Sequence, residues 1–156
     1  MDKVINKFDG EYEFLSNFYP CKVTYKGITY NHSEGAFQAA KTTNEEIKRA
    51  SVNLSAGRSK RAFGKRGLAG FPKFTLRSDW EEVKDNTMYE VVKAKFEQNP
   101  DLKEKLLKTG DAYLIEGTMW HDNYWGDCQC EKCKIIKGKN QLGLTLMRVR
   151  DELRME

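Results

Sequence analysis

The sequence predicts an α+β protein, a mostly helical single domain with a small antiparallel sheet. Helix-forming stretches with capping residues and apolar stripes recur along most of the 156 residues. Two short runs rich in β-branched and aromatic residues, Cys21 to Tyr25 and Ile28 to Tyr30, flank Lys26-Gly27, a pattern typical of a hairpin. The length is sufficient for one real core and too short for two, so one domain over residues 1–156 is expected.

Helices are expected where a capping residue precedes a helix-forming stretch. Asn31 lies three residues before Glu34, and Ser78 lies three residues before Glu81, which is the spacing of a capping box. A short strand is expected over residues 112–116. The expected helices cover roughly residues 33–42, 45–52, 55–65, 78–99, 101–107 and 140–153.

The most irregular stretch runs from Gly117 to Lys139, and we call it the site loop. Loops of over about twenty residues inside compact domains are usually functional or disordered. This one contains two tryptophans, a histidine, three cysteines and several acids. These residue types predict that the loop carries part of a functional site.

Charge and hydropathy limit the class of protein. There are 27 basic and 23 acidic side chains, and the net charge of +4 suits a phosphate-bearing partner without requiring one. The first ten residues, MDKVINKFDG, lack the apolar segment of a signal peptide, and no run of about 18 apolar residues occurs. A cytoplasmic protein with no membrane partner is expected.

Four cysteines are distributed unevenly. Cys128, Cys130 and Cys133 fall within six residues, whereas Cys21 stands alone. In a reducing compartment they are thiols or metal ligands. The cluster has the density of a zinc site, with His121 or Cys21 as a candidate fourth ligand, but the usual pairing of CxxC motifs is missing. Reduced, inert cysteines are the favoured interpretation, and zinc and a reactive thiol cluster are the alternatives.

Two carboxylates are candidate catalytic groups. Glu34 lies at a predicted helix start, where free amides and the positive dipole end favour its ionised form. An ionised carboxylate can stabilise a cationic transition state or orient a water molecule. It cannot act as a general acid near neutral pH unless burial of the side chain offsets the effect of the dipole. Asp127 follows Tyr124, Trp125 and Gly126, which fixes a carboxylate beside aromatic rings. A plain capping acid and a turn aspartate are the alternatives.

Aromatic side chains near these acids are candidate stacking groups. Hydrolysis of a ribosyl bond passes through an oxocarbenium-like state, which carboxylates can stabilise. Phe18, Trp80 and Trp125 can stack on a base or a nicotinamide-like ring. A place in the core explains Trp80 equally well.

Basic side chains offer phosphate contacts. Arg58, Arg61 and Lys65 fall at spacings of three and four, which places them on one face of a predicted helix. A solvated basic face is the favoured alternative. Three lysines of the site loop can contact a nucleic-acid backbone or simply aid solubility. These are Lys134, Lys137 and Lys139.

Several motifs in order resemble one family. They are FLSNFYP at Phe14 to Pro20, HSEGAFQAAK at His32 to Lys41, DW before a helix ending VVKAKFEQNP, YWG-D, and GKNQLGLTLMRVR. Together they resemble the NADAR family of YbiA-like N-glycosidases from about Phe8 to Leu153. The resemblance implies the YbiA-like NADAR fold.

The resemblance also implies roles for particular residues. The catalytic glutamate of the SE-x-x-FQ motif corresponds to Glu34, and the acid after YWG corresponds to Asp127. The implied ligand-binding residues are Asn17, Phe18, Trp80 and Trp125, followed by Arg58, Lys84 and Asn140. The sequence departs from the family at Gly35, where a bulkier residue is common, and in its cysteine cluster, which occurs in only part of the family.

The combined expectation is a monomeric N-glycosidase that needs no metal and no cofactor. The resemblance implies two substrates: ADP-ribosylated guanine in DNA, or a phosphorylated ribosylamino-pyrimidine of the riboflavin pathway, of the 5-amino-6-ribosylaminouracil 5'-phosphate type. The basic excess favours the first. A noncatalytic module that binds NAD or ADP-ribose is one alternative function, and a zinc-bearing nucleic-acid adaptor is another.

Overall fold

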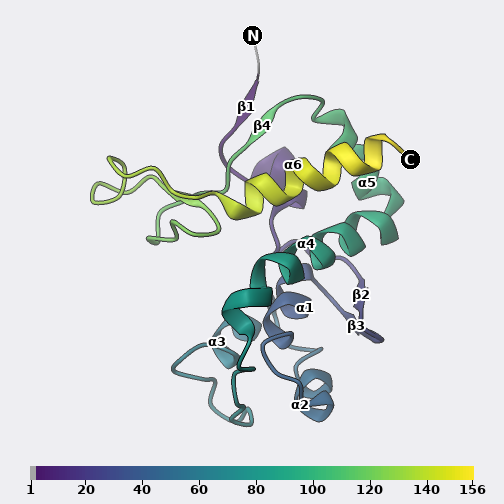
Figure 1. The fold of residues 1–156 in the computed structure, drawn as a ribbon, viewed down its shortest axis with the longest axis vertical. Coiled ribbons are helices and arrows are strands. Elements are labelled where there is room, and N and C mark those ends of the chain that lie inside the picture. Colours follow the sequence, from purple (N-terminus) through teal and green to yellow (C-terminus); the bar gives the residue numbers. More distant parts are fainter. Residues whose placement is uncertain (1–2) are drawn as a thin grey trace. The chain divides into compact units, whose positions relative to one another are not determined.

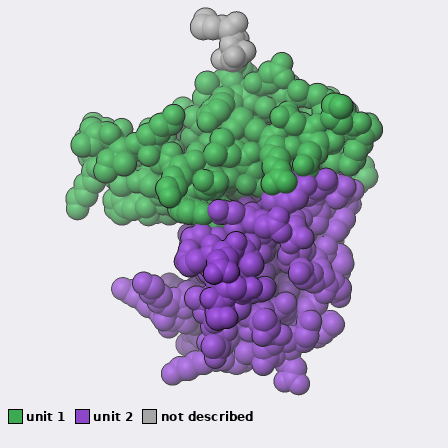
Figure 2. Space-filling view, viewed as in Figure 1, with its two compact units in different colours: residues 1–16, 100–156 green, residues 17–99 purple. Residues whose placement is uncertain are grey.

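Helices dominate the computed structural model, which describes residues 3–156 (Figure 1). Six α-helices, one 3-10 helix and three two-stranded sheets are formed by these residues. The chain divides into two compact units, residues 1–16 with 100–156 and residues 17–99, green and purple in Figure 2. In the part of the chain described, no helix is both long and apolar enough to cross a membrane. The mostly helical α+β class is confirmed.

The unit of residues 17–99 begins with the predicted hairpin. Its strands pair in antiparallel fashion with Val23 opposite Tyr30, and the turn places Lys26 at φ 49° and Gly27 at φ 84°. Two positive φ values in succession are what a two-residue hairpin turn requires, and glycine adopts them without strain. The elements are β2 (Val23–Tyr25), β3 (Ile28–Tyr30), α1 (Ser33–Ala39), α2 (Glu45–Ala50), α3 (Ala56–Ala62) and α4 (Trp80–Gln98).

Helix α1 lies at the centre of this unit. It packs against α3, α4 and the hairpin, and all seven of its residues are buried. Helix α4 packs against both α1 and β2 and buries Val91, Val92 and Phe96 completely. A carboxylate on α1 is therefore fixed inside a packed core rather than on a surface.

The unit of residues 1–16 and 100–156 is built around the last helix. Helix α6 packs on α5 and β4, and it buries Leu142, Leu146, Val149 and Leu153 as its stripe predicted. Strand β1 pairs with β4 and β5 pairs with β6, both in parallel. The elements are β1 (Val4–Ile5), η1 (Gly10–Leu15), α5 (Pro100–Lys108), β4 (Tyr113–Leu114), β5 (Gly117–Thr118), β6 (Asp127–Cys128) and α6 (Gln141–Arg154).

One predicted capping residue and one predicted helix start are wrong, whereas the start of α1 at Ser33 is as predicted. His32, not Asn31, caps α1, because its ring Nδ1 accepts the backbone N–H three residues ahead at 2.9 Å. The Asn31 side chain instead donates to the Val52 carbonyl at 3.1 Å. Helix α4 starts at Trp80 rather than Ser78, and its cap makes no side-chain hydrogen bond.

Candidate active site

Glu34 is the second residue of α1 and is held from two sides. Its backbone N–H donates to the Asn17 carbonyl at 2.9 Å. Its Oε1 accepts a hydrogen bond from the Gln38 Nε2, one helical turn ahead, also at 2.9 Å. Only 8% of Glu34 is exposed, and Gln38 Oε1 is buried with no hydrogen-bond partner among the described residues. The site therefore contains a buried carboxylate and an unused acceptor.

The environment of Glu34 shifts its proton equilibrium. Burial raises the pKa of the Glu34 carboxyl, whereas the hydrogen bond from Gln38 and the positive charges of Lys60 and Lys41 act in the opposite direction. Burial also lowers the pKa of Lys41, which Glu34 partly counteracts. The dipole of this seven-residue helix favours the ionised form of Glu34, but burial of the carboxyl outweighs it. A carboxyl with a raised pKa can exchange protons closer to neutral pH.

Asn17 positions the first turn of α1. Its Oδ1 accepts from the Ser33 hydroxyl at 2.9 Å, and its Nδ2 donates to the Met88 sulfur at 3.4 Å. Ser33 is fully buried and Asn17 is 7% exposed. These contacts give Asn17 a clear role in holding the residue next to Glu34.

Gly35 is explained by the cap that precedes it. A Cβ at this position would lie 2.8 Å from Cε1 of His32, closer than real contacts allow. The His32 ring uses Nδ1 as the acceptor of the cap, which leaves Nε2 to donate to the Leu54 carbonyl at 2.9 Å. Glycine at position 35 therefore makes room for the histidine ring.

The two predicted aromatic residues of this unit differ in exposure. Trp80 is 6% exposed and packs on Phe37, with ring centroids 5.2 Å apart. Phe18 exposes 48% of its surface. Trp80 thus belongs to the core, as the alternative held, and Phe18 presents a ring on which a ligand can stack.

The site loop carries Asp127 at the start of β6. Oδ1 of Asp127 accepts the Gly138 N–H at 2.9 Å, and the residue is half-buried. A Cβ on Gly138 would lie 2.4 Å from the Gly126 carbonyl oxygen, so this close approach requires glycine. The Asp122 Oδ1 accepts the backbone N–H of Trp125 at 2.9 Å, which holds the backbone of this half-buried residue two positions before Asp127.

Asn140 connects the site loop to the start of α6. It adopts the left-handed conformation at φ 53° and is buried. Its Oδ1 accepts the Glu116 N–H at 2.9 Å, and its Nδ2 donates to the Leu114 carbonyl at 2.8 Å. Both ends of the amide are therefore engaged by backbone groups, which identifies a positioning role for this residue.

Comparison with known proteins identifies the family. The NADAR domain family matches residues 5–154. The chain belongs to this family. It is 37% identical over 161 residues to N-glycosidase YbiA of Escherichia coli, covering 99% of this chain and 91% of YbiA. It is 35% identical over 149 residues to a riboflavin biosynthesis protein of Vibrio vulnificus, covering 93% of this chain and 36% of the relative.

A solved structure supports the same conclusion. The NMR structure of E. coli YbiA matches with a TM-score of 0.79 and 34% identity, covering 99% of this chain and 88% of that one. The YbiA-like NADAR fold inferred from the sequence motifs is therefore confirmed. The relatives named N-glycosidase are hydrolases of N-glycosyl bonds, the enzyme class expected from the resemblance.

The predicted phosphate face is only partly formed in this NADAR protein. Arg58 and Arg61 lie exposed on α3, but the helix ends at Ala62, so Lys65 falls in the following turn. The prediction of one helical face for all three residues is wrong, because the helix stops before Gly64. Lys84 on α4 forms an ion pair with Glu81, Nζ to Oε2 2.5 Å.

Sequence reasoning missed the groups that surround Glu34. Gln38 lies four residues after Glu34, a spacing that by itself predicts contact between the two side chains on a helix. Lys41 follows α1, and Lys60 comes from α3. Only the packing of α1 against α3 brings the Lys60 charge to bear on Glu34, and no local pattern signals it.

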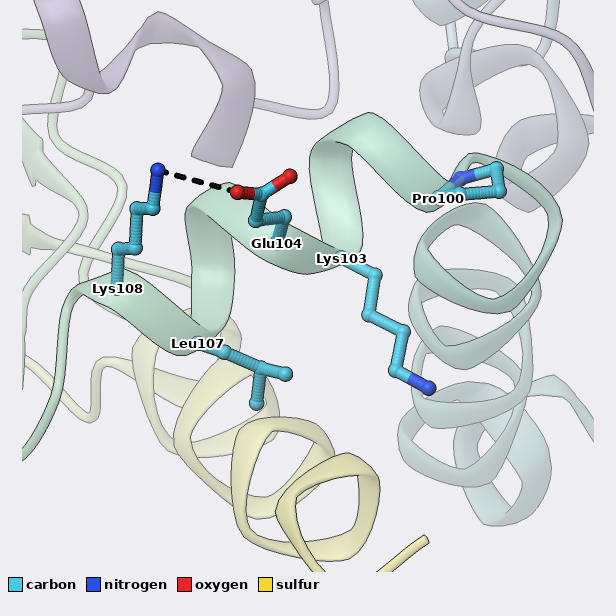
Figure 3. Close-up of a pocket in the computed structure, with 5 residues that line it drawn as sticks. All are labelled: Pro100, Lys103, Glu104, Leu107 and Lys108. Carbon is cyan, nitrogen blue, oxygen red and sulfur yellow. Dashed lines mark ion pairs between the residues drawn. The ribbon is translucent and has the colours of Figure 1, made fainter.

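A surface hollow of about 370 Å³ lies along α5, a segment of the sequence that contains none of the predicted site residues. Lys108 and Glu104 form an ion pair there, Nζ to Oε1 3.1 Å. The lining residues are Pro100, Lys103, Glu104, Leu107 and Lys108 (Figure 3). None of the predicted site residues is among them, so the hollow is assigned no part in catalysis.

Proposed function

We propose that this NADAR protein is an N-glycosidase that hydrolyses the bond between a ribose carbon and a base-like nitrogen. Glu34 and Asp127 are the proposed catalytic carboxylates. The observation that carries the proposal is the buried Glu34 with its raised pKa, at the glutamate of the SE-x-x-FQ motif. The N-glycosidase name of the full-length relative supports the same reaction class.

The two acids have different surroundings and are proposed to have different roles. Glu34 takes a proton from the attacking water, since the cations of Lys41 and Lys60 keep its ionised form accessible despite burial. Asp127 supplies negative charge to the oxocarbenium-like state. The water oxygen bonds to the ribose carbon, the carbon–nitrogen bond breaks, and its electron pair and the proton go to the departing nitrogen.

The ligand-binding residues follow from exposure and contacts. Phe18 and Trp125 are proposed to stack on the base, and Arg58 and Lys84 to contact phosphate. Asn17 and Asn140 hold their neighbours in place through the hydrogen bonds described above. Trp80, buried against Phe37, supports the site from the core. The proposed enzyme requires no cofactor.

Two substrate classes are proposed, each favoured by a specific observation. The riboflavin biosynthesis protein of Vibrio vulnificus favours a phosphorylated ribosylamino-pyrimidine. The net charge of +4 and the exposed Arg58 and Arg61 favour ADP-ribosylated guanine in DNA. Both substrates contain an N-ribosyl bond and phosphate, so one set of catalytic groups serves either.

Parallel turnover assays test the proposal. The protein is incubated with each substrate, and product release is followed by chromatography. Glu34→Gln and Asp127→Asn should abolish most release from the accepted substrate. Glu46→Gln, the second residue of α2 and exposed, and Glu131→Gln, an exposed acid of the site loop, are matched controls that should retain it. Ligand binding without release from either substrate would indicate the noncatalytic module instead.

A further inference from the structure

Four potential metal ligands gather in the site loop. They are Nδ1 of His121 and the Sγ atoms of Cys128, Cys130 and Cys133, and we call them the Cys3His cluster. These atoms all lie within 4.8 Å of one another. Sequence separations of up to twelve residues do not by themselves bring four donor atoms together.

Two distances within the cluster are close to those of a tetrahedral zinc site. Nδ1 of His121 lies 3.3 Å from the Sγ atoms of both Cys130 and Cys133. Zinc bonds of about 2.3 Å to sulfur and 2.0–2.1 Å to nitrogen give a tetrahedron with nitrogen–sulfur edges of about 3.5 Å. The same bonds give sulfur–sulfur edges of about 3.8 Å. The two nitrogen–sulfur distances are therefore close to the edges of a zinc tetrahedron, and the remaining donor atoms, within 4.8 Å, can close on the ion with small side-chain rotations.

The local backbone is shaped to present these ligands. Between Cys130 and Cys133 the chain turns tightly, with the Cys133 N–H donating to the Cys130 carbonyl at 3.1 Å. His121 adopts a left-handed φ of 66°, uncommon for a residue with a side chain, and its N–H donates to Cys128 Sγ at 3.2 Å. An unusual backbone conformation that brings the His121 ring to two cysteine sulfurs and its N–H to the third is a stronger indication than cysteine spacing alone.

We propose that the Cys3His cluster binds one Zn²⁺ ion as a structural site. Three thiolates and one imidazole are a closed ligand set for zinc and leave no position open for water or substrate. Sulfur donors select zinc over magnesium or calcium, which take oxygen ligands. The zinc interpretation, an alternative at the level of the sequence, thus replaces the expectation of inert cysteines.

The metal would fix the part of the site loop that carries Asp127. Cys128 is buried and is the direct neighbour of Asp127 in β6. The Cys128 N–H also donates to Oδ1 of Asn123 at 2.8 Å, which closes the loop behind the strand. Zinc is therefore a positioning element for Asp127. The ion itself takes no part in the hydrolytic step proposed above.

Metal analysis of the full chain tests the proposal independently of activity. Protein expressed with zinc and purified under reducing conditions is loaded with one equivalent of Zn²⁺, desalted and measured by mass spectrometry of the metal. One zinc per chain is expected. Cys130→Ser and Cys133→Ser should bind zinc at least about tenfold more weakly in competition with a chelator, because even outer-shell changes cost roughly 10–100-fold. Cys21→Ser, the same change outside the cluster, should bind normally.

A second measurement needs no variant. Replacing zinc with Co²⁺ should give a sulfur-to-cobalt charge-transfer band and the intense visible bands of tetrahedral cobalt. Zinc well below one per chain, zinc retained fully by both cluster variants, or a pale octahedral cobalt spectrum would each overturn the proposal. Loss of turnover with full zinc content, in contrast, would count against the proposed function alone.

Discussion

Glu34→Gln removes the ability of residue 34 to take up a proton while preserving its size. Glutamine still offers an oxygen to Gln38 Nε2, so the 2.9 Å hydrogen bond within α1 can persist. The side chain remains in the same buried space, and no cavity forms. The substitution therefore separates proton transfer from packing.

The expected loss of activity follows from the role of the carboxylate. General-base catalysis by a positioned group contributes about 10²–10⁴-fold. At about 1.36 kcal/mol per tenfold change, this corresponds to roughly 3–5 kcal/mol of transition-state stabilisation. We expect kcat to fall by that factor in a turnover assay, with KM changed little, because residue 34 would not bind the substrate differently in its ground state.

Although Glu34→Gln should lose activity, it should gain stability relative to the parent protein. Burial raises the folded-state pKa of Glu34 above its ordinary 4.5, so the protonated form is the one that folding favours. The stability contributed by Glu34 is present below pH 4.5 and is lost as pH rises through the raised pKa. Glu34→Gln should therefore become progressively more stable than the parent in denaturant titrations above pH 4.5.

The raised pKa of Glu34 also determines how the reaction rate depends on pH. In the parent, kcat should decline toward acid with a midpoint above 4.5, because the protonated base is inactive. A folded Glu34→Gln variant with parental kcat would refute the role of Glu34. A parent rate that rises toward acid would instead identify Glu34 as a proton donor.

Asp127→Asn should lower kcat by about 10²-fold or more, as for other groups that stabilise charge at the reacting centre, and parental turnover would contradict its role. Gly143→Ala should unfold more easily, because its Cβ would lie 2.1 Å from the Leu114 carbonyl oxygen. A cost of about 1–3 kcal/mol is expected, and calorimetry should show a Tm lower by roughly 2–4 °C for each kcal/mol. Trp80→Ala should destabilise the fold by about 3–5 kcal/mol in denaturant titrations. Phe18→Ala should instead raise KM with little change in stability, and a stability loss matching that of Trp80→Ala would contradict its assignment as a binding ring.

Local signals predicted the hairpin and the last helix well. The hairpin depends on Lys26-Gly27, whose turn conformation is a property of two neighbouring residues. The stripe from Leu142 to Leu153 marks the buried face of α6 because helical periodicity is itself local. Features encoded within a few residues could therefore be predicted without the structure.

Features that depend on distant contacts could not be predicted. The parallel pairs β1–β4 and β5–β6 are only two residues long per strand, too short for a pattern to appear. The cap of α1 went to His32 because the ring also reaches the Leu54 carbonyl, a contact across 22 residues. Asn31 and His32 can both cap a helix, and contacts with residues distant in sequence determine which of them does so.

In the candidate site, too, some features are set by the local sequence and others by contacts between distant residues. The motif containing Glu34 was visible in the sequence, but its burial and the influence of Lys60 depend on the packing of α1 against α3. The cysteines were likewise noted from spacing alone. The approach of the His121 ring to the sulfurs of Cys130 and Cys133 depends on the left-handed backbone conformation of His121, which the local sequence does not specify.

Product analysis in heavy-oxygen water shows whether this protein hydrolyses an N-ribosyl bond and where the solvent oxygen goes. Purified protein is incubated with ADP-ribosylated guanine DNA and, separately, with a phosphorylated ribosylamino-pyrimidine, and the products are resolved by liquid chromatography and mass spectrometry. We predict release of the free nitrogen base from at least one substrate, with one solvent oxygen on the ribose carbon, and loss of this reaction in Glu34→Gln. Folded parent protein that leaves both N-ribosyl bonds intact at the rate of buffer alone would contradict the account.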